Sequence, residues 1–239
     1  MWVIAEYEAT SLFSLKPATA TASGGRTLLV PTPFAIKMAL LDIACRLEGI
    51  EVAKTHWTWL NRCIVAIRGA DDVVVNNTFI KILKPRRNPA SEGSIDQGPL
   101  QRTISYREFA YLDGTFEIAL QIDDANHAEL LSQWLIHINY LGKRGGFIQI
   151  QQEPVEVDEL PNEFIIVDGK AFEDGFVMNA LLTQLDDTGE KTSFDHVDIY
   201  SGKNIRLGIE RILHHVALPY ILEKSSRHYS YYRRNDATD

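Results

Sequence analysis

The order in which strand-like and helix-like segments follow one another constrains the fold of this chain most. Residues 2–9 alternate loosely between apolar and polar side chains and predict a strand. A helix follows, since Thr32 can act as its N-cap, Pro33 suits its first position and Gly49 can end it. Its apolar face is broad, so the helix is expected to be mostly buried. Residues 60–68 predict the next strand. The first part of the chain therefore reads strand, helix, strand.

The same pattern returns further along the chain. Residues 115–122 predict a third core strand. Asp124 can cap a helix over residues 125–141, and Gly142 fits the position just beyond its end. Residues 147–152 predict a fourth strand. The complete order is βαββαβ, which is the ferredoxin-like or RRM-like split unit.

The sequence therefore predicts an α+β protein with two parts. The first is a ferredoxin-like domain over residues 1–152, with a long β-hairpin inserted over about residues 73–112 between its second and third strands. The second is a less regular C-terminal extension over residues 153–239. Within it, apolar residues at helical spacing predict a helix over 204–218, and residues 183–195 resemble a loop.

Positive charge is concentrated in the inserted hairpin. Residues 81–107 carry six basic and two acidic side chains, in a chain whose formal net charge is −8. The basic residues are Lys81, Lys84, Arg86, Arg87, Arg102 and Arg107. Lysine and arginine contact phosphates, and an extended hairpin can lie along or across a nucleic acid strand. The segment therefore predicts a binding site for a polyanion, with a disordered surface loop as the alternative.

Two further segments suggest anion or RNA binding. In LGKRGGF, residues 141–147, glycines allow backbone amides to approach an anion, and Lys143 and Arg144 add charge; a tight turn explains the segment equally well. Residues 227–234 interleave basic and aromatic side chains, which suits single-stranded RNA or another protein. Terminal segments of this kind are also often disordered.

Several functional classes find no support in the motifs. The chain has no Walker, Rossmann or nucleophile-elbow pattern and no ligand pairs with zinc spacing, so neither a cofactor nor a metal is expected. Cys45 and Cys63 lie within apolar patterns and predict buried free thiols. Apolar runs fall well short of the ~20 residues that span a bilayer. A cytoplasmic protein without a membrane partner is expected.

Taken together, these segments resemble CRISPR-associated RAMP proteins, specifically the Cas-five family, the single-copy subunit of type I Cascade complexes. The resemblance rests on the opening strand with its glycine-containing loop and the helix PTPFAIKMALLDIACRL, and on the insertion that ends in TISYREFAYLDGTFEIAL. It rests further on the LGKRGGF loop and on the overall order of elements. It covers about the first two-thirds of the chain.

The resemblance implies that the protein caps the CRISPR RNA (crRNA) by gripping its repeat-derived 5′ handle. The inserted hairpin would act as a thumb that reaches over the guide toward the backbone RAMP subunits, and the protein would seat the large subunit. Target DNA would be engaged through the complex. The implied RNA-binding residues are Lys16, Arg26, Lys37, Asn76, Asn77, Lys81, Lys84, Arg86, Arg87, Arg102, Tyr106, Arg107, Gly142, Lys143, Arg144, Gly145 and Gly146.

A non-catalytic RNA-binding scaffold subunit is the favoured interpretation, and three alternatives stay open. One branch of the family cleaves precursor RNA, and Tyr7, Lys16 and His56 are candidates by residue type for such an endoribonuclease. The chain could instead be the repeated backbone RAMP subunit. It could also be a ferredoxin-like interaction module that binds no RNA.

Overall fold

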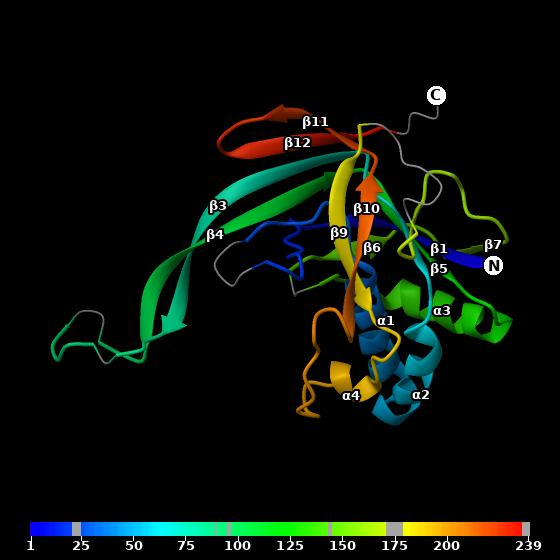
Figure 1. Ribbon diagram of the computed structural model, residues 1–239, viewed down its shortest axis with the longest axis horizontal. Helices are drawn as coiled ribbons and strands as arrows, with labels where there is room; N and C mark the ends of the chain where they lie inside the picture. Colours follow the sequence, from blue (N-terminus) through cyan, green and yellow to red (C-terminus); the bar gives the residue numbers. More distant parts are fainter. Residues whose placement is uncertain (21–24, 89, 95–96, 143–144, 171–178, 236–239) are drawn as a thin grey trace.

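A computed structural model describes residues 1–20, 25–88, 90–94, 97–142, 145–170 and 179–235. The protein is a mixed α/β structure with antiparallel sheets and few helices (Figure 1). The main sheet has the strand order β6-β1-β5-β2-β8, with β7 also paired to β1. Its strands are β1 (Trp2–Ala9), β2 (Val65–Arg68), β5 (Thr115–Gln121), β6 (Ile148–Ile150), β7 (Val155–Val157) and β8 (Ile165–Val167).

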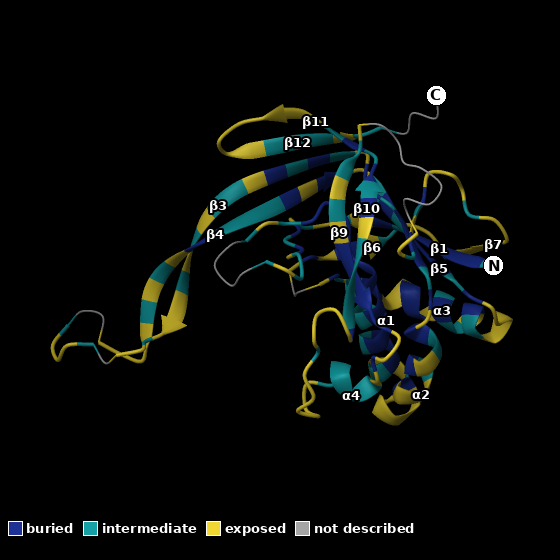
Figure 2. Cartoon of the chain, viewed as in Figure 1, coloured by how far each residue is buried: buried dark blue, intermediate teal, exposed yellow. Residues whose placement is uncertain are grey.

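Helices α1 (Pro33–Glu48), α2 (Ile50–Leu60) and α3 (Ala125–His137) share one hydrophobic core with this sheet. Buried side chains such as Val3, Ile118 and Leu131 belong to that core. A smaller cluster that includes Trp2 and Phe164 lies apart from it. Figure 2 shows that burial is concentrated where the helices and the sheet meet.

The bounds of α1 follow from its caps. The hydroxyl of Thr32 accepts a hydrogen bond from the backbone N–H of Ala35 at 3.2 Å, and Pro33 occupies the first turn. Gly49 has a φ of +87°, and α2 begins directly after it. The sequence analysis did not predict this second helix. It ends at Leu60, and the strand predicted over residues 60–68 is confined to β2, Val65–Arg68. Ala53, Trp57 and Leu60 form its buried stripe.

The inserted hairpin consists of β3 (Asp72–Pro85) and β4 (Leu100–Asp113). Its two strands pair in unbroken register from Asp72 with Asp113 to Pro85 with Leu100. The base of the hairpin lies against the body of the protein, and its distal half projects away from it (Figure 1). Strands β11 (Tyr220–Ser225) and β12 (Tyr229–Arg234) complete a sheet of order β11-β12-β3-β4.

The basic aromatic segment near the C-terminus is therefore an ordered strand. β12 pairs with β3 from Tyr229 with Asn76 to Arg233 with Asp72. Its arginines bind acidic residues: Arg233 Nε lies 3.4 Å from an Asp72 carboxylate oxygen, and the Arg234 guanidinium lies 2.6 Å from Asp71. These ion pairs attach β12 to the base of the hairpin, so the positive charge of both arginines is paired within the protein.

The predicted helix over residues 204–218 is wrong. Residues Arg211–Leu218 form strand β10, which pairs antiparallel with β9 (Leu181–Thr188). The first part of the predicted loop at 183–195 accordingly belongs to β9, and a short helix α4 (Phe194–Val197) follows it. Val216 and Leu218 are both buried, and this spacing of two is that of a strand with one face toward a core.

An enclosed ion pair attaches β9 to α1. Lys37 is 1% exposed, and its ammonium lies 2.8 Å from a carboxylate oxygen of Asp187. The same ammonium donates to the backbone oxygen of Asn61 at 3.0 Å and lies 3.4 Å from the hydroxyl of Thr188.

Because β7 and β8 also pair with β1 and β2, the main sheet continues past residue 152, the predicted end of the first domain.

Within the described part of the chain, no helix combines the length and the apolar character needed to cross a membrane.

Candidate nucleic-acid interface

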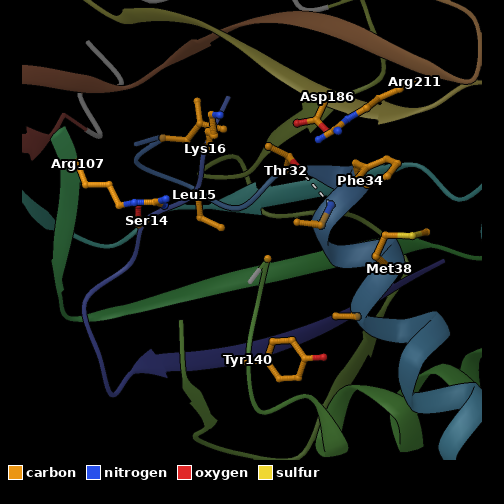
Figure 3. Close-up of a pocket in the computed structure, with 14 residues that line it drawn as sticks. Ser14, Leu15, Lys16, Thr32, Phe34, Met38, Arg107, Tyr140, Asp186 and Arg211 are labelled. Atoms are coloured by element: carbon orange, nitrogen blue, oxygen red, sulfur yellow. Dashed lines mark hydrogen bonds and ion pairs between the residues drawn. The ribbon is translucent and has the colours of Figure 1, made fainter. Parts of the chain in front are cut away.

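A pocket of about 530 Å³ lies where α1, β4 and the loop before β6 meet β9 and β10 (Figure 3). It brings together Lys16, Arg107 and Gly142, which the sequence placed in three separate candidate segments. Its lining residues are Ser14, Leu15, Lys16, Leu28, Thr32, Phe34, Ala35, Met38, Ala39, Arg107, Tyr140, Gly142, Asp186 and Arg211.

One wall of the pocket is apolar and comes from α1. Phe34, Ala35, Met38 and Ala39 lie at i and i+4 spacing, so they share one face of the helix. All four are only half-buried. Tyr140 adds an aromatic ring, and its hydroxyl donates to Asp42 at 3.3 Å. A half-exposed apolar helix face beside an aromatic ring suits a flat, partly apolar ligand such as a nucleobase.

The opposite wall carries positive charge. Arg107 reaches into the pocket from β4 (Figure 3), and Lys16 is exposed at the rim. The Nε atom of Arg107 is buried and has no hydrogen-bond partner among the described residues. A guanidinium binds phosphate particularly well, so Arg107 is a candidate for a phosphate contact on this wall.

Backbone contacts hold this wall in place. The backbone N–H of Phe13 donates to Ala110 at 2.8 Å, and that of Ala110 donates back at 2.7 Å, so the segment that carries Lys16 is paired to β4. Gly25 also approaches β4, since a Cβ at this position would lie 2.6 Å from the backbone oxygen of Tyr106. Only glycine permits that approach.

The glycine-rich loop lies against the same segment. Gly142 has a φ of +73°, and a Cβ there would lie 2.8 Å from a methyl carbon of Leu15. The backbone oxygen of Gly145 accepts from the hydroxyl of Ser11 at 2.6 Å. A Cβ on Gly146 would come within 2.9 Å of the backbone oxygen of Leu141. The glycines therefore serve close packing beside the pocket; Lys143 and Arg144 lie outside the described residues.

A buried carboxylate closes the pocket on the side of β9 and β10. Asp186 is 2% exposed and accepts from Arg211, whose Nε and terminal nitrogen both lie 2.7 Å from Oδ2. The Arg211 guanidinium also covers the ring of Phe34 at 4.2 Å from its centroid. Sequence reasoning missed both residues because they belong to strands predicted as loop and helix. The apolar residues Val216 and Leu218, two positions apart, were the sequence signal that could have indicated a strand here.

The distal hairpin presents a surface of mixed character. Lys81, Lys84, Arg87 and Arg102 are exposed, and Arg86 donates to the backbone oxygen of Leu100 at 3.3 Å. Exposed apolar residues accompany these charges: Phe79, Leu83, Leu100 and Ile104 are between 45% and 73% exposed. Tyr106 packs edge-on against Phe79, with ring centroids 5.4 Å apart. Such a surface offers both cations and stacking groups.

The remaining predicted residues lie in different surroundings. Arg26 and Asn76 are exposed. Asn77 is engaged by the turn between β11 and β12, because its backbone N–H donates to His228 at 2.8 Å. Lys37 is enclosed by Asp187 and Asn61, so its ammonium has no route to a ligand and we leave it out of the interface.

No family model matches the chain. A curated relative, CRISPR-associated protein Cas5 of Archaeoglobus fulgidus, is 23% identical over 219 residues, which cover 88% of this chain and 90% of the relative. Among solved structures, a CRISPR protein from Archaeoglobus fulgidus aligns with a TM-score of 0.46 and 11% identity, covering 98% of this chain and 92% of the other. A chain described as a CRISPR RNA-guided surveillance complex aligns with a TM-score of 0.49 and 13% identity, covering 91% of each chain. The curated relative spans most of the chain, so the resemblance to the Cas-five family predicted from the sequence is confirmed.

Proposed function

We propose that this protein is the RNA-binding structural subunit of a type I Cascade surveillance complex and that it caps the 5′ handle of the crRNA. Its partners would be the crRNA, the backbone RAMP subunits and the large subunit, with target DNA bound through the complex. The curated relative supports the assignment to a CRISPR system.

One observation carries the RNA-binding part of the proposal. Lys16, Arg107 and Gly142 come from three separate segments that the sequence had marked as candidates, and they line one pocket at the base of the basic hairpin. The pocket and the hairpin both carry cationic side chains that can contact phosphates and apolar or aromatic side chains that can contact bases. Short single-stranded RNA is the polyanion that uses both.

The sheet topology supports the ferredoxin-like interpretation of the core. The order β6-β1-β5-β2, with α1 between β1 and β2 and α3 between β5 and β6, agrees with a βαββαβ unit whose strands are all antiparallel neighbours. The hairpin of β3 and β4 then takes the place of the thumb insertion, between the second and third strands of that unit.

A non-catalytic role agrees with the surroundings of two catalytic candidates. Tyr7 is fully buried, its hydroxyl donates to the backbone oxygen of Leu135 at 2.8 Å, and burial raises its pKa far above the ordinary value. His56 lies 3.0 Å from a Glu48 carboxylate oxygen and accepts from the indole of Trp59 at 3.2 Å. Both groups are therefore engaged by other residues of the protein, which supports a binding role over catalysis.

The test is to co-express the protein with its genomic neighbours, purify the assembly and sequence the RNA that accompanies it. We expect short RNAs that share one repeat-derived 5′ end, in a complex with one copy of this chain. Many copies per RNA would indicate the repeated backbone subunit, and purification without RNA or partners would contradict the proposal.

The endoribonuclease alternative has its own assay. The purified chain is incubated with a labelled repeat RNA and a metal chelator, next to its His56→Ala variant. We expect intact RNA in both reactions. Cleavage by the unaltered protein that the substitution abolishes would identify an enzyme instead of a scaffold.

A further inference from the structure

The pocket contains a hydrogen-bond acceptor that the proposed handle-binding role does not use. Arg211 donates to Oδ2 of Asp186, and among the described residues no donor binds the other carboxylate oxygen, Oδ1. Asp186 is nearly enclosed by protein, yet it lines the pocket. An acceptor with little access to water binds a donor from a ligand more strongly than a solvated one does.

The groups around this acceptor are arranged for a single nucleotide. The apolar face of α1, from Phe34 to Met38, provides a surface for a base, and Lys16 and Arg107 lie on the other wall, where they can bind adjoining phosphates (Figure 3). The volume of about 530 Å³ falls within the range of about 300–1,000 Å³ found for small-molecule sites.

We propose that the pocket holds one unstacked nucleobase of the bound RNA and that Asp186 selects a base with an exocyclic amino group. Adenine, cytosine and guanine each carry such an amino donor, and uracil does not. Arg211 acts as a positioning residue, because both of its contacts are with Oδ2 of Asp186 and they leave Oδ1 for the ligand. This inference rests on the proposed function, since it requires that the protein bind RNA.

The isosteric substitution Asp186→Asn gives a directional test. The amide oxygen can still accept from Arg211, and the amide nitrogen then replaces Oδ1 as a donor. At the ring position where cytosine carries its amino group, uracil carries a carbonyl oxygen, so a donor from the protein at this place favours uracil over cytosine. The substitution should therefore reverse the base preference instead of simply weakening binding.

The experiment uses the full chain and a pool of short single-stranded RNAs with randomised sequence, from which bound molecules are recovered and sequenced. For the unaltered protein we expect one position at which uracil is depleted about tenfold, the discrimination of one good base contact. For Asp186→Asn we expect uracil to be enriched at that position, with the overall salt dependence unchanged.

Two further variants keep the test informative. Asp195→Asn removes another ion-paired acid in the C-terminal third, whose partner Lys203 lies 2.7 Å away, and it should leave the preference unaltered. Ala39→Leu fills the pocket from the helix side without touching Asp186, and it should remove the preference at that position while the other positions still bind.

The possible results separate the two proposals. If the unaltered protein binds no RNA from the pool, the proposed function itself is refuted. If it binds RNA but discriminates against uracil at no position, or if Asp186→Asn selects the same sequences as the unaltered protein, the pocket assignment is overturned and RNA binding stands. A preference that responds to Asp195→Asn as strongly as to Asp186→Asn would equally overturn it.

Discussion

Replacing Lys37 by methionine tests the ion pair that attaches the C-terminal strand β9 to helix α1. The ammonium of Lys37 is enclosed, 2.8 Å from Asp187 and 3.0 Å from the backbone oxygen of Asn61. Methionine keeps most of the length of the side chain and removes its charge. The substitution therefore leaves the Asp187 carboxylate in the protein interior without its main partner.

The expected cost follows from that isolation. The carboxylate would keep the contacts from Thr188, whose backbone N–H donates to it at 2.6 Å, and the more distant His214 at 3.9 Å. Removing one partner of a buried ion pair typically costs about 3–5 kcal/mol, because the other charge remains buried without compensation. For a chain of 239 residues, this corresponds to a fall in the melting temperature of about 6–20 °C.

The assay is chemical or thermal unfolding of matched variants. Arg46→Met on the same helix removes an exposed ion pair with Asp42 and should cost less than ~1 kcal/mol. The double variant Lys37→Met/Asp187→Leu removes both buried charges and should recover most of the stability that the single substitution removes. The folded Lys37→Met protein should also bind RNA with an unchanged salt dependence, since Lys37 lies outside the interface.

Two results would refute this reasoning. A Lys37→Met protein as stable as the Arg46→Met control would mean that Asp187 does not depend on Lys37; His214, 3.9 Å from its carboxylate, would then be the alternative partner. A double variant less stable than the single one would mean that the pair stabilises the fold beyond the compensation of its own charges.

Three further predictions concern the hairpin, the glycine-rich loop and the ion pair between Arg206 and Glu210. Replacing Arg86 and Arg87 with alanine should lower the slope of log affinity against log salt by ~1.4, or ~0.7 for each phosphate of single-stranded RNA that the protein no longer binds, as measured by binding titrations over a salt series. Gly142→Ala should cost about 1–3 kcal/mol in unfolding experiments, because φ is +73° at this position. Hydrogen bonds from Arg206 lower the pKa of Glu210 to about 2, so the stability they contribute is complete above the unfolded pKa of about 4.3 and is lost as the pH falls through 2. Denaturant midpoints of Glu210→Gln should accordingly differ from those of the unaltered protein at pH 7 and converge with them near pH 2.

Each of these has a control. Alanine substitutions of Lys54 and Arg62 on and after α2 remove the same charge away from the interface, and an equal fall in slope would contradict the role of the hairpin. Gly49→Ala meets the same backbone strain at a φ of +87° but has no atom within 4 Å of the added carbon. Equal destabilisation at both glycines would show that the close approach to Leu15 carries no cost. A Glu210→Gln difference that does not change with pH would refute the ion-pair account.

Local signals predicted the elements whose ends are defined by neighbouring residues. The start and end of α1 follow from Thr32 and Gly49, and Asp124 caps α3 as expected, with its side chain accepting from the backbone N–H of Asn126 at 2.9 Å. The two limbs of the hairpin were visible as extended runs on either side of a segment rich in proline, glycine and serine. These features depend on contacts close in sequence.

The failures depend on contacts between distant residues. Residues 211–218 fit a helical stripe as well as a strand, and their pairing with β9, about 30 residues earlier in the case of His215 with Gln184, decides between the two. The Asp186 side of the pocket could not be predicted for the same reason, because Asp186 and Arg211 meet only once β9 and β10 pair. Lys37 was assigned to RNA because a lone lysine on a helix gives no sign of the acid that buries it.

The pairing of β12 with β3 has a consequence for biosynthesis. The hairpin is complete in sequence once β4 has left the ribosome, yet the strand that closes its base, residues 229–234, is made more than a hundred residues later than β4. Until then, the backbone groups of β3 at the base remain an open sheet edge, which can pair with other chains. Contacts this far apart in sequence also form slowly. A chain truncated before residue 229 would keep this edge open.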